Sequence, residues 1–446
     1  MIIDYAAAND QELWNTIRLQ AYLTNVGSPF DSGPSICTCD NLTPQILGAT
    51  GPYTTPDAAV DPAPWYDPAV PASAQFLGFL PLSVEGTDDN PRARSVTGAV
   101  GGGGVFGPTR DLPRTMTVSG VLIGSTCCGA QYGLQYMSEA LSSCSGDACD
   151  GDCFTMYNCC ADPGAMTPAQ YNAAYRRTFR RTSLVSGPTV TRRRGSGTCD
   201  SSNCAAGAEL IEVEFVLVAA TPWAWTDPIP LLEVTPPIGG DGDCIDWCVS
   251  NNVDPEHSCD PSTCLFQTCT TPGDPCGDPR NPVPLPPQPK VPAGSFCAPL
   301  GPERDCYDLD LSTRPQWATD VPVVQIYSGA DPLRNIRVTF YEKPDGTTDT
   351  CDQVADKNLC NPVQDFTVTY IPPRTTLTLD GTIGRATVNC DSNCRTASTA
   401  YGNQDGGPVT VSDFTCATYC VCIETDTEYP PAADSLVAIS VVGKGY

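Results

Sequence analysis

The sequence predicts a mainly β protein. A β-rich N-terminal domain with one short helix is followed by a cysteine-rich linker and a C-terminal antiparallel β-sandwich. The 446 residues include 39 glycines and 44 prolines, which favour turns and interrupt helices. Apolar and polar residues also alternate with a period of two in several segments, whereas helical periodicity is scarce.

The N-terminal domain is assigned to residues 1–235. Its strongest strand signals are Arg114–Gly124 and 210–218, because in each segment alternate side chains form one apolar face. One apolar stripe at helical spacing predicts the short helix, and it consists of Leu134, Met137 and Leu141.

The first 110 residues are rich in turn-forming residues and are expected to be mostly irregular. One strand is expected there, because apolar residues alternate with polar or small ones at Ile17, Leu19, Ala21 and Leu23. Four consecutive glycines, 101–104, do not follow the strand-to-helix pattern of a nucleotide site, and we interpret them as a flexible loop.

The C-terminal domain is assigned to residues 301–446 and is predicted to be the β-sandwich. Short alternating segments recur there, and an Asp-Gly pair at 380–381 predicts a hairpin turn. Between the two domains, residues 236–300 are rich in cysteine and proline and poor in apolar residues. We interpret this stretch as a linker, with an extended proline-rich part at 281–292.

Charge and hydropathy argue against two classes of partner. Lysine and arginine number 24 against 51 aspartates and glutamates, and the net charge is −27. Nucleic-acid binding needs a positive surface, so it is not expected. Membrane insertion is not expected either, because no apolar run approaches the ~20 residues that span a bilayer.

Cysteine usage predicts disulfides. The chain has 26 cysteines, but its first residues lack the basic start and apolar run of a secretory signal. We therefore expect a protein made in a cytosol that functions outside it without secretion. A zinc site remains the alternative at Cys390, Cys394, Cys416 and Cys420, where pairs have metal-like spacing. Disulfides are favoured because the cysteines are spread over every segment, so no cofactor is expected.

The sequence does not predict an enzyme. His257 is the only histidine, so any Ser-His or Cys-His nucleophile system would depend on it. It lies within the cysteine-rich linker, where an exposed loop histidine is the simpler interpretation. No nucleophile-elbow, zinc-protease or phosphate-loop motif is present.

One basic segment interrupts the acidic sequence and is our candidate for subunit contacts. Complementary charge steers association, so these arginines could meet an acidic face on another copy of the chain. The residues are Arg176, Arg177, Arg180, Arg181, Arg192, Arg193 and Arg194.

Several segments resemble minor tail proteins and distal tail proteins of siphophages infecting actinobacteria. Near the N-terminus these segments are IRLQAYL at 17–23, DPAPWYD at 61–67, the glycine loop and Arg114–Gly124. The C-terminal segments are YIPP at 370–373, LDG at 379–381, RATV at 385–388 and the cysteines at 416–422. The resemblance spans most of the chain, and 244–297 matches it least.

The resemblance implies a structural protein of the virion tail tip, made in the host cytoplasm and released by lysis. It implies that the N-terminal domain forms a ring, a hexamer, that joins the tail tube to the baseplate, hub or fibres. An alternative is a module that binds host-surface carbohydrate, for which exposed aromatic residues such as Trp317, Tyr341 or Tyr401 would be needed. Core positions are the favoured interpretation of these aromatic residues. A cell-wall-degrading tail enzyme is a third possibility, disfavoured by the lone histidine.

Overall fold

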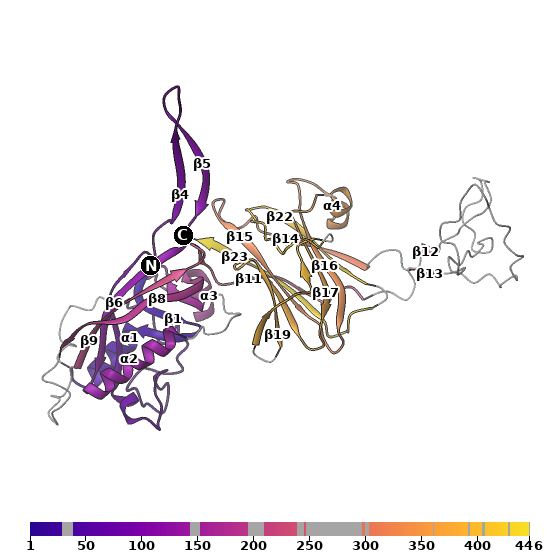
Figure 1. The fold of residues 1–446 in the computed structure, drawn as a ribbon. Coiled ribbons are helices and arrows are strands. Elements are labelled where there is room, and N and C mark those ends of the chain that lie inside the picture. Colours follow the sequence, from indigo (N-terminus) through magenta and orange to yellow (C-terminus); the bar gives the residue numbers. More distant parts are fainter. Residues whose placement is uncertain are drawn as a thin grey trace, which may run out of the picture.

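The computed structural model describes residues 1–28, 39–142, 152–194, 209–238, 245–246, 297–298, 303–359, 361–390, 393–403, 406–426 and 429–445. These residues form a mainly β protein with antiparallel sheets, four α-helices and disulfides, which confirms the predicted fold class. Figure 1 shows an N-terminal lobe beside a C-terminal lobe, with one hairpin projecting from the first. Within the described residues, no helix is long and apolar enough to cross a membrane.

The N-terminal lobe consists of two sheet arms that share one long strand. One arm has the order β2-β1-β7-β8 and the other the order β3-β6-β9-β8. Inward side chains of both arms form one core, in which Trp14 contacts the rings of Phe79, Phe154 and Phe215. The strands are β1 (Ile2–Ala8), β2 (Gln11–Asn15), β3 (Phe76–Glu85), β6 (Arg114–Gly124), β7 (Asp152–Tyr157), β8 (Arg176–Arg194) and β9 (Glu209–Ala219).

The two strongest strand predictions are confirmed. Arg114–Gly124 is β6, and its partner β9 covers the predicted 210–218. They pair in continuous antiparallel register, from Arg114 opposite Ala219 to Gly124 opposite Glu209. The alternating burial of both strands matches the alternating sequence, because only one face meets the core.

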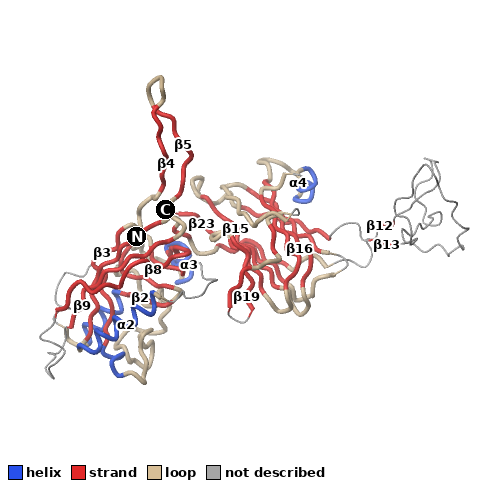
Figure 2. Tube along the Cα trace, viewed as in Figure 1, coloured by secondary structure: helices blue, strands red, loops and turns tan. Residues whose placement is uncertain are grey.

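The expectation of a single short helix in this lobe is wrong, because α1, α2 and α3 all lie there. The predicted strand around Ile17 is the helix α1. Figure 2 shows helices of this lobe in blue beside the red strands. In α1 the buried residues are Thr16, Arg18, Leu19, Tyr22 and Leu23, which lie on one side of the helix. The Asn15 side chain caps the helix by accepting a bond from the Arg18 amide. The helices are α1 (Thr16–Asn25), α2 (Cys127–Leu141) and α3 (Pro168–Tyr175), with a 3-10 turn, η2 (Pro71–Gln75).

The glycine run is the tight end of a projecting hairpin. Strands β4 (Arg92–Gly98) and β5 (Gly104–Asp111) pair only with each other. At the turn, the amide of Ala99 donates to Gly103 O, and Gly102 and Gly103 adopt positive φ angles of 91° and 83°. Glycine is needed there because side chains rarely tolerate this conformation. The expected flexible loop is therefore an ordered turn between two strands that sequence analysis did not find.

The C-terminal lobe is the predicted β-sandwich. A five-stranded sheet, β14-β22-β16-β17-β21, faces β11-β23-β15-β18-β19-β20 across an aliphatic and aromatic core. One helix, α4 (Cys351–Lys357), lies against β22 and β14. The strands are β14 (Glu303–Asp310), β15 (Thr319–Tyr327), β16 (Leu333–Glu342), β17 (Gln364–Ile371), β18 (Thr376–Asp380), β19 (Arg385–Cys390), β20 (Asn393–Thr396), β21 (Ala400–Tyr401), β22 (Thr418–Thr425) and β23 (Leu436–Gly445).

Two short strands join the lobes. The strand β10 (Ala224–Trp225) pairs with both β8 and β23, and β11 (Ile229–Val234) pairs with β23 inside the sandwich. Residues 229–234 were assigned to the N-terminal domain, but here they pair with a strand of the C-terminal sandwich. The domain limits remain a prediction, and these pairings favour a boundary before residue 229. The linker assigned to 236–300 lies outside the described residues, apart from 236–238 and the ladder of β12 (Ile245–Asp246) with β13 (Cys297–Ala298).

Candidate functional site

All seven arginines of the predicted contact segment lie on β8. The first half of this strand pairs with β7 and β10, and the second half pairs with β9. The strand changes register near Gly187, so it contributes to both sheet arms. The arginines therefore divide into a group at 176–181, next to the lobe junction, and a group at 192–194, at the far end.

The first group borders two adjoining cavities on the outer face of the β1-β7-β8 sheet. They measure about 330 and 310 Å³ and share Asp10, Thr155 and Arg176 in their walls. Arg180, Cys153 and Trp225 line the larger cavity. On the opposite face of the same strands, Phe154 and Phe179 point into the core, as alternation requires.

Arginines of the first group form ion pairs and hydrogen bonds with other residues of the chain. Arg176 Nη2 lies 2.8 Å from Asp227 Oδ2, and Arg180 Nη1 lies 3.0 Å from Cys153 Sγ. Arg180 Nη2 also reaches Asp380 of the C-terminal lobe at 3.9 Å. Burial alone would lower the pKa of Arg176, but the hydrogen bond and charge of Asp227 outweigh burial and raise it. Arg176 and Arg180 are thus held at the lobe junction.

The two described side chains of the second group face solvent. The side chains of Arg192 and Arg193 are exposed, and Arg193 Nη2 donates to Gln131 Oε1 of α2 at 3.1 Å. Arg194 belongs to β8, but its side chain lies outside the described part of the structure. Of the predicted contact residues, Arg192 and Arg193 are therefore the ones seen to be available to a neighbour.

The β4–β5 hairpin is a second candidate surface, and it was missed by sequence analysis. Phe106 is 65% exposed, and Val96, Val100 and Val105 are exposed as well. Arg94 lies over the Phe106 ring at 5.6 Å, and Arg92 pairs with Asp111 at 3.0 Å. The four glycines broke the apolar pattern, which is why the two strands were hard to predict.

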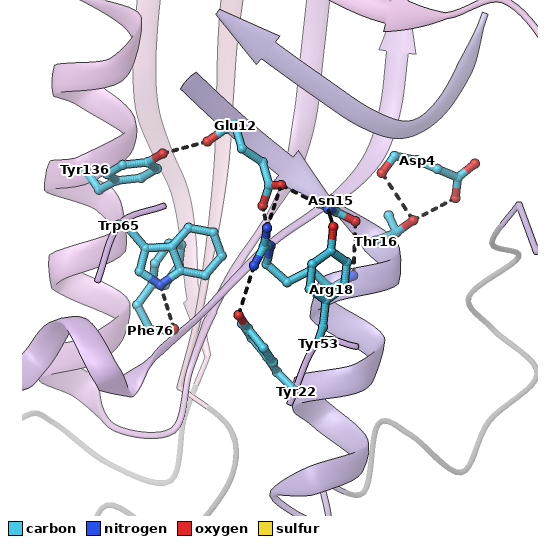
Figure 3. Close-up of polar contacts among 10 residues, drawn as sticks. All are labelled: Asp4, Glu12, Asn15, Thr16, Arg18, Tyr22, Tyr53, Trp65, Phe76 and Tyr136. Atoms are coloured by element: carbon cyan, nitrogen blue, oxygen red, sulfur yellow. Dashed lines mark hydrogen bonds and ion pairs between the residues drawn. The ribbon is translucent and has the colours of Figure 1, made fainter. Parts of the chain in front are cut away.

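A buried polar cluster lies between β2, α1 and α2 in the N-terminal lobe (Figure 3). Arg18 Nε lies 2.8 Å from Glu12 Oε1, and Arg18 Nη1 donates to Tyr22 Oη at 3.3 Å. Asn15 donates to Glu12, and Tyr136 donates to the Glu12 carbonyl. Burial raises the pKa of Tyr53, which neighbours Arg18, to about 12. The cluster joins β2, α1 and α2. A tyrosine with so high a pKa does not suit proton transfer near neutral pH.

The described cysteines are largely disulfide-bonded. The pairs are Cys39–Cys160, Cys306–Cys422 and Cys351–Cys420, and Cys127 is also bonded. Because Cys420 is bonded to Cys351, it has no thiolate to offer the alternative zinc site. Cys416 is a free thiol, and the side chains of Cys390 and Cys394 lie outside the described residues, as does His257.

Exposure separates the aromatic residues proposed for stacking. Trp317 is 84% exposed, whereas Tyr341 is 2% exposed and belongs to the small core beneath α4, so Tyr341 was a wrong candidate. Tyr401 is half-buried. Tyr370 and Tyr429, which sequence analysis did not select, are exposed and flank Arg334.

No protein-family model and no curated protein matches the chain. Among solved structures, the Dit protein (gp 19.1) of phage SPP1, described as a hub of the adsorption apparatus in phages infecting Gram-positive bacteria, aligns with a TM-score of 0.32 and 10% identity. The alignment covers 79% of this chain and 94% of that one. The phage P2 baseplate in its activated conformation with Ca aligns with a TM-score of 0.35 and 7% identity, over 78% of this chain and 91% of that chain. The chain thus has weak structural similarity to phage Dit hub and baseplate proteins.

Proposed function

We propose that this chain is a structural, non-enzymatic component of a phage tail tip that assembles with copies of itself into a ring. The observation that carries self-assembly is the β4–β5 hairpin. A two-stranded hairpin standing alone is marginally stable in water, and this one exposes every residue of β4. Contact with a neighbouring subunit would cover its apolar side chains and both of its free edges.

Charge supports a second copy of the chain as the neighbour. The hairpin carries Arg92, Arg94 and Arg110 against the single Asp111, whereas the whole chain has a net charge of −27. A basic arm that meets an acidic neighbour offsets the repulsion between copies. Because the hairpin and its acceptor are different surfaces, the contact is head-to-tail, and such contacts close into rings when the rotation allows.

The tail-tip location rests on the sequence resemblance, which covers both lobes. A hexameric ring, contact with the tail tube, hub and fibres, and an actinobacterial host are the finer parts of this proposal. Trp317, exposed on the C-terminal sandwich, favours carbohydrate binding as a second candidate function. Loss of binding to soluble cell-wall polysaccharide in Trp317→Ala, measured by affinity electrophoresis, would support that second function.

Mass photometry of the full chain tests self-assembly. We expect the double variant Val96→Ser, Phe106→Ser to shift rings toward monomers, because it removes the apolar side chains at the end of the arm. Leu359→Ser is the matched control, since Leu359 is an exposed apolar residue of the C-terminal lobe. Rings that persist in the hairpin variant at the abundance of the control would contradict the proposed arm.

A further inference from the structure

Two exposed tyrosines hold an arginine between them at one end of the C-terminal sandwich. Arg334 on β16 and Tyr370 on β17 are direct cross-strand partners, and Tyr429 lies in the connection from β22 to β23. The Arg334 Cζ lies 5.5 Å from the Tyr370 ring centroid and 5.0 Å from that of Tyr429. Tyr370 is 38% exposed and Tyr429 is 44% exposed. We name these three residues the Tyr–Arg–Tyr cluster.

Buried hydrogen bonds make the scaffold beneath this cluster rigid. Ser328 is fully buried, and its Oγ donates to Pro372 O at 2.6 Å, just beyond Tyr370. Ser435 Oγ donates to Ser328 O at 2.6 Å and so ties in the connection that carries Tyr429. These bonds hold the backbone beside Tyr370 and the end of the connection that carries Tyr429, and such preorganisation lowers the entropy lost on binding.

The cluster has unused binding capacity. Among the described residues, the Arg334 guanidinium has cation–π contacts with the two rings but no hydrogen bond. Its N–H groups are therefore available to carbonyl oxygens, and the exposed ring faces are available to small apolar groups. Two aromatic rings with a donor between them match the surfaces that bind proline-rich peptides in an extended left-handed helix.

The chain itself contains such a peptide, and its attachment points adjoin the cluster. Residues 281–292 read NPVPLPPQPKVP, with six prolines in twelve positions. Thr425 Oγ1 donates to Pro237 O at 2.7 Å, and Glu303 is the register partner of Thr425. The next residue, Asp426, accepts a bond from Asn335 Nδ2 at 2.7 Å, beside Arg334. Pro237 and Glu303, which flank the stretch 239–302, therefore lie near the cluster.

We propose that the Tyr–Arg–Tyr cluster binds the proline-rich segment 281–292 of this chain. Ten residues, 293–302, connect that segment to Glu303. They include β13, Cys297–Ala298, and could span at most about 33 Å if fully extended. Prolyl rings pack on Tyr370 and Tyr429, while Arg334 donates to peptide carbonyls that the proline helix leaves unpaired. A short tether gives an effective concentration in the millimolar range, so a weak contact is enough to hold the segment.

Fluorescence anisotropy with a labelled synthetic peptide, NPVPLPPQPKVP, tests this proposal. The receptor is the full chain with 281–292 replaced by a Gly/Ser sequence of equal length, which leaves the cluster open. We expect saturable binding, and weaker binding to the wild-type chain, because its own segment competes. Tyr370→Ala, Tyr429→Ala and Arg334→Ala should each weaken binding about tenfold or more, the scale of a lost hot-spot contact.

Trp317→Ala is the matched control, because Trp317 is an exposed aromatic residue outside the cluster. A peptide with every proline replaced by alanine should not bind. Melting curves of the three cluster variants should match the parent, since exposed substitutions change stability little. No binding to the open receptor, equal binding by the tyrosine variants, or capture of polysaccharide but not peptide would each overturn the proposal. Ring assembly, measured separately by mass photometry, is independent of these outcomes.

Discussion

Glu12 and Arg18 form an ion pair at 2.8 Å inside the N-terminal lobe, where their side chains are only 7% and 8% exposed. The pair joins β2 to the first turns of α1, and Tyr22 and Asn15 complete its hydrogen bonds. A buried pair of this kind is strongly destabilised when one partner is removed, because the other charge stays buried and uncompensated.

We therefore predict that Glu12→Gln lowers the free energy of unfolding by about 3–5 kcal/mol. Arg92→Gln is the control, because it breaks the exposed pair with Asp111 and should cost less than about 1 kcal/mol. Urea denaturation followed by circular dichroism measures both values. Equal and small losses in the two variants would show that the buried pair does not stabilise the lobe.

Asp4 gives a pH-dependent prediction. Burial raises its pKa above the ordinary 3.8, although the Thr16 hydroxyl donates to the carboxylate at 2.8 Å. The folded state therefore binds the proton more tightly than the unfolded state, so this contribution to stability is complete below pH 3.8 and is lost as the pH rises through the raised value.

Asp4→Asn removes this titration. The free energy of unfolding of the variant, minus that of the wild type, should accordingly increase between about pH 3 and pH 7. Urea titrations at several pH values measure the difference, with Asp88→Asn as an exposed control. A difference that is constant with pH would mean that Asp4 does not titrate abnormally.

The disulfide between Cys351 and Cys420 should stabilise the C-terminal lobe by tying α4 to β22. We expect the double variant Cys351→Ser, Cys420→Ser to lose about 2–4 kcal/mol. Cys416→Ser should be nearly neutral, because Cys416 is a free thiol. Elemental analysis should find no stoichiometric zinc in the wild-type protein. Zinc that is bound to the wild type but absent from both variants would instead support the metal site.

The exposed end of β8 should contribute to assembly. Replacing Arg192, Arg193 and Arg194 by glutamate is expected to weaken ring formation without unfolding the monomer, since Arg192 and Arg193 face solvent. Contacts made by exposed charges should also weaken at 1 M salt, where the Debye length is about 3 Å. Mass photometry across salt concentrations measures both effects.

Arg176→Glu is the informative contrast. Arg176 is paired with Asp227 at the lobe junction, so its replacement should lower the melting temperature rather than selectively prevent assembly. If the triple variant assembles as well as the wild type at every salt concentration, the 192–194 group is only a solvated strand end.

The C-terminal sandwich should fold as a fragment, but its best limits differ from those expected. Residues 301–446 lack β11, which pairs with β23 from Ile229 to Val234. We predict a cooperative melt for 301–446 and a higher melting temperature for 228–446, because the longer fragment restores that strand. Circular dichroism melts under oxidising conditions compare the two, and equal melting temperatures would argue that β11 is dispensable.

The amino-acid pattern predicts an element correctly where its burial is one-sided, and incorrectly where local chemistry competes with periodicity. Residues of β6 and β9 alternate between core and solvent, so their pattern is unambiguous. In α1, the apolar residues at odd positions imitated a strand, although the Asn15 cap and the buried Thr16, Leu19 and Leu23 follow the helical period. The capping residue Asn15 therefore indicated a helix, whereas the alternating apolar residues indicated a strand.

The functional surfaces were harder to predict, because exposure and proximity depend on the whole fold. Seven clustered arginines looked equivalent in sequence, yet Arg176 meets Asp227 only after the chain has crossed to β10. Tyr341 and Tyr370 each sit in a strand of the same sheet, but the first lies beneath α4, whereas the second is exposed near the end of β17. Periodicity does not encode which face a later helix will cover.

The pairing of β23 has a consequence for the order of folding. Its residues bond with β15 at a separation of about 117 positions, and Gly445 pairs with Ala224, some 220 positions earlier. Contacts this distant in sequence form slowly, because a long loop must close before they stabilise anything. The N-terminal lobe can thus be completed while the ribosome is still making the sandwich, and the two lobes become one unit only when the final strand closes between them.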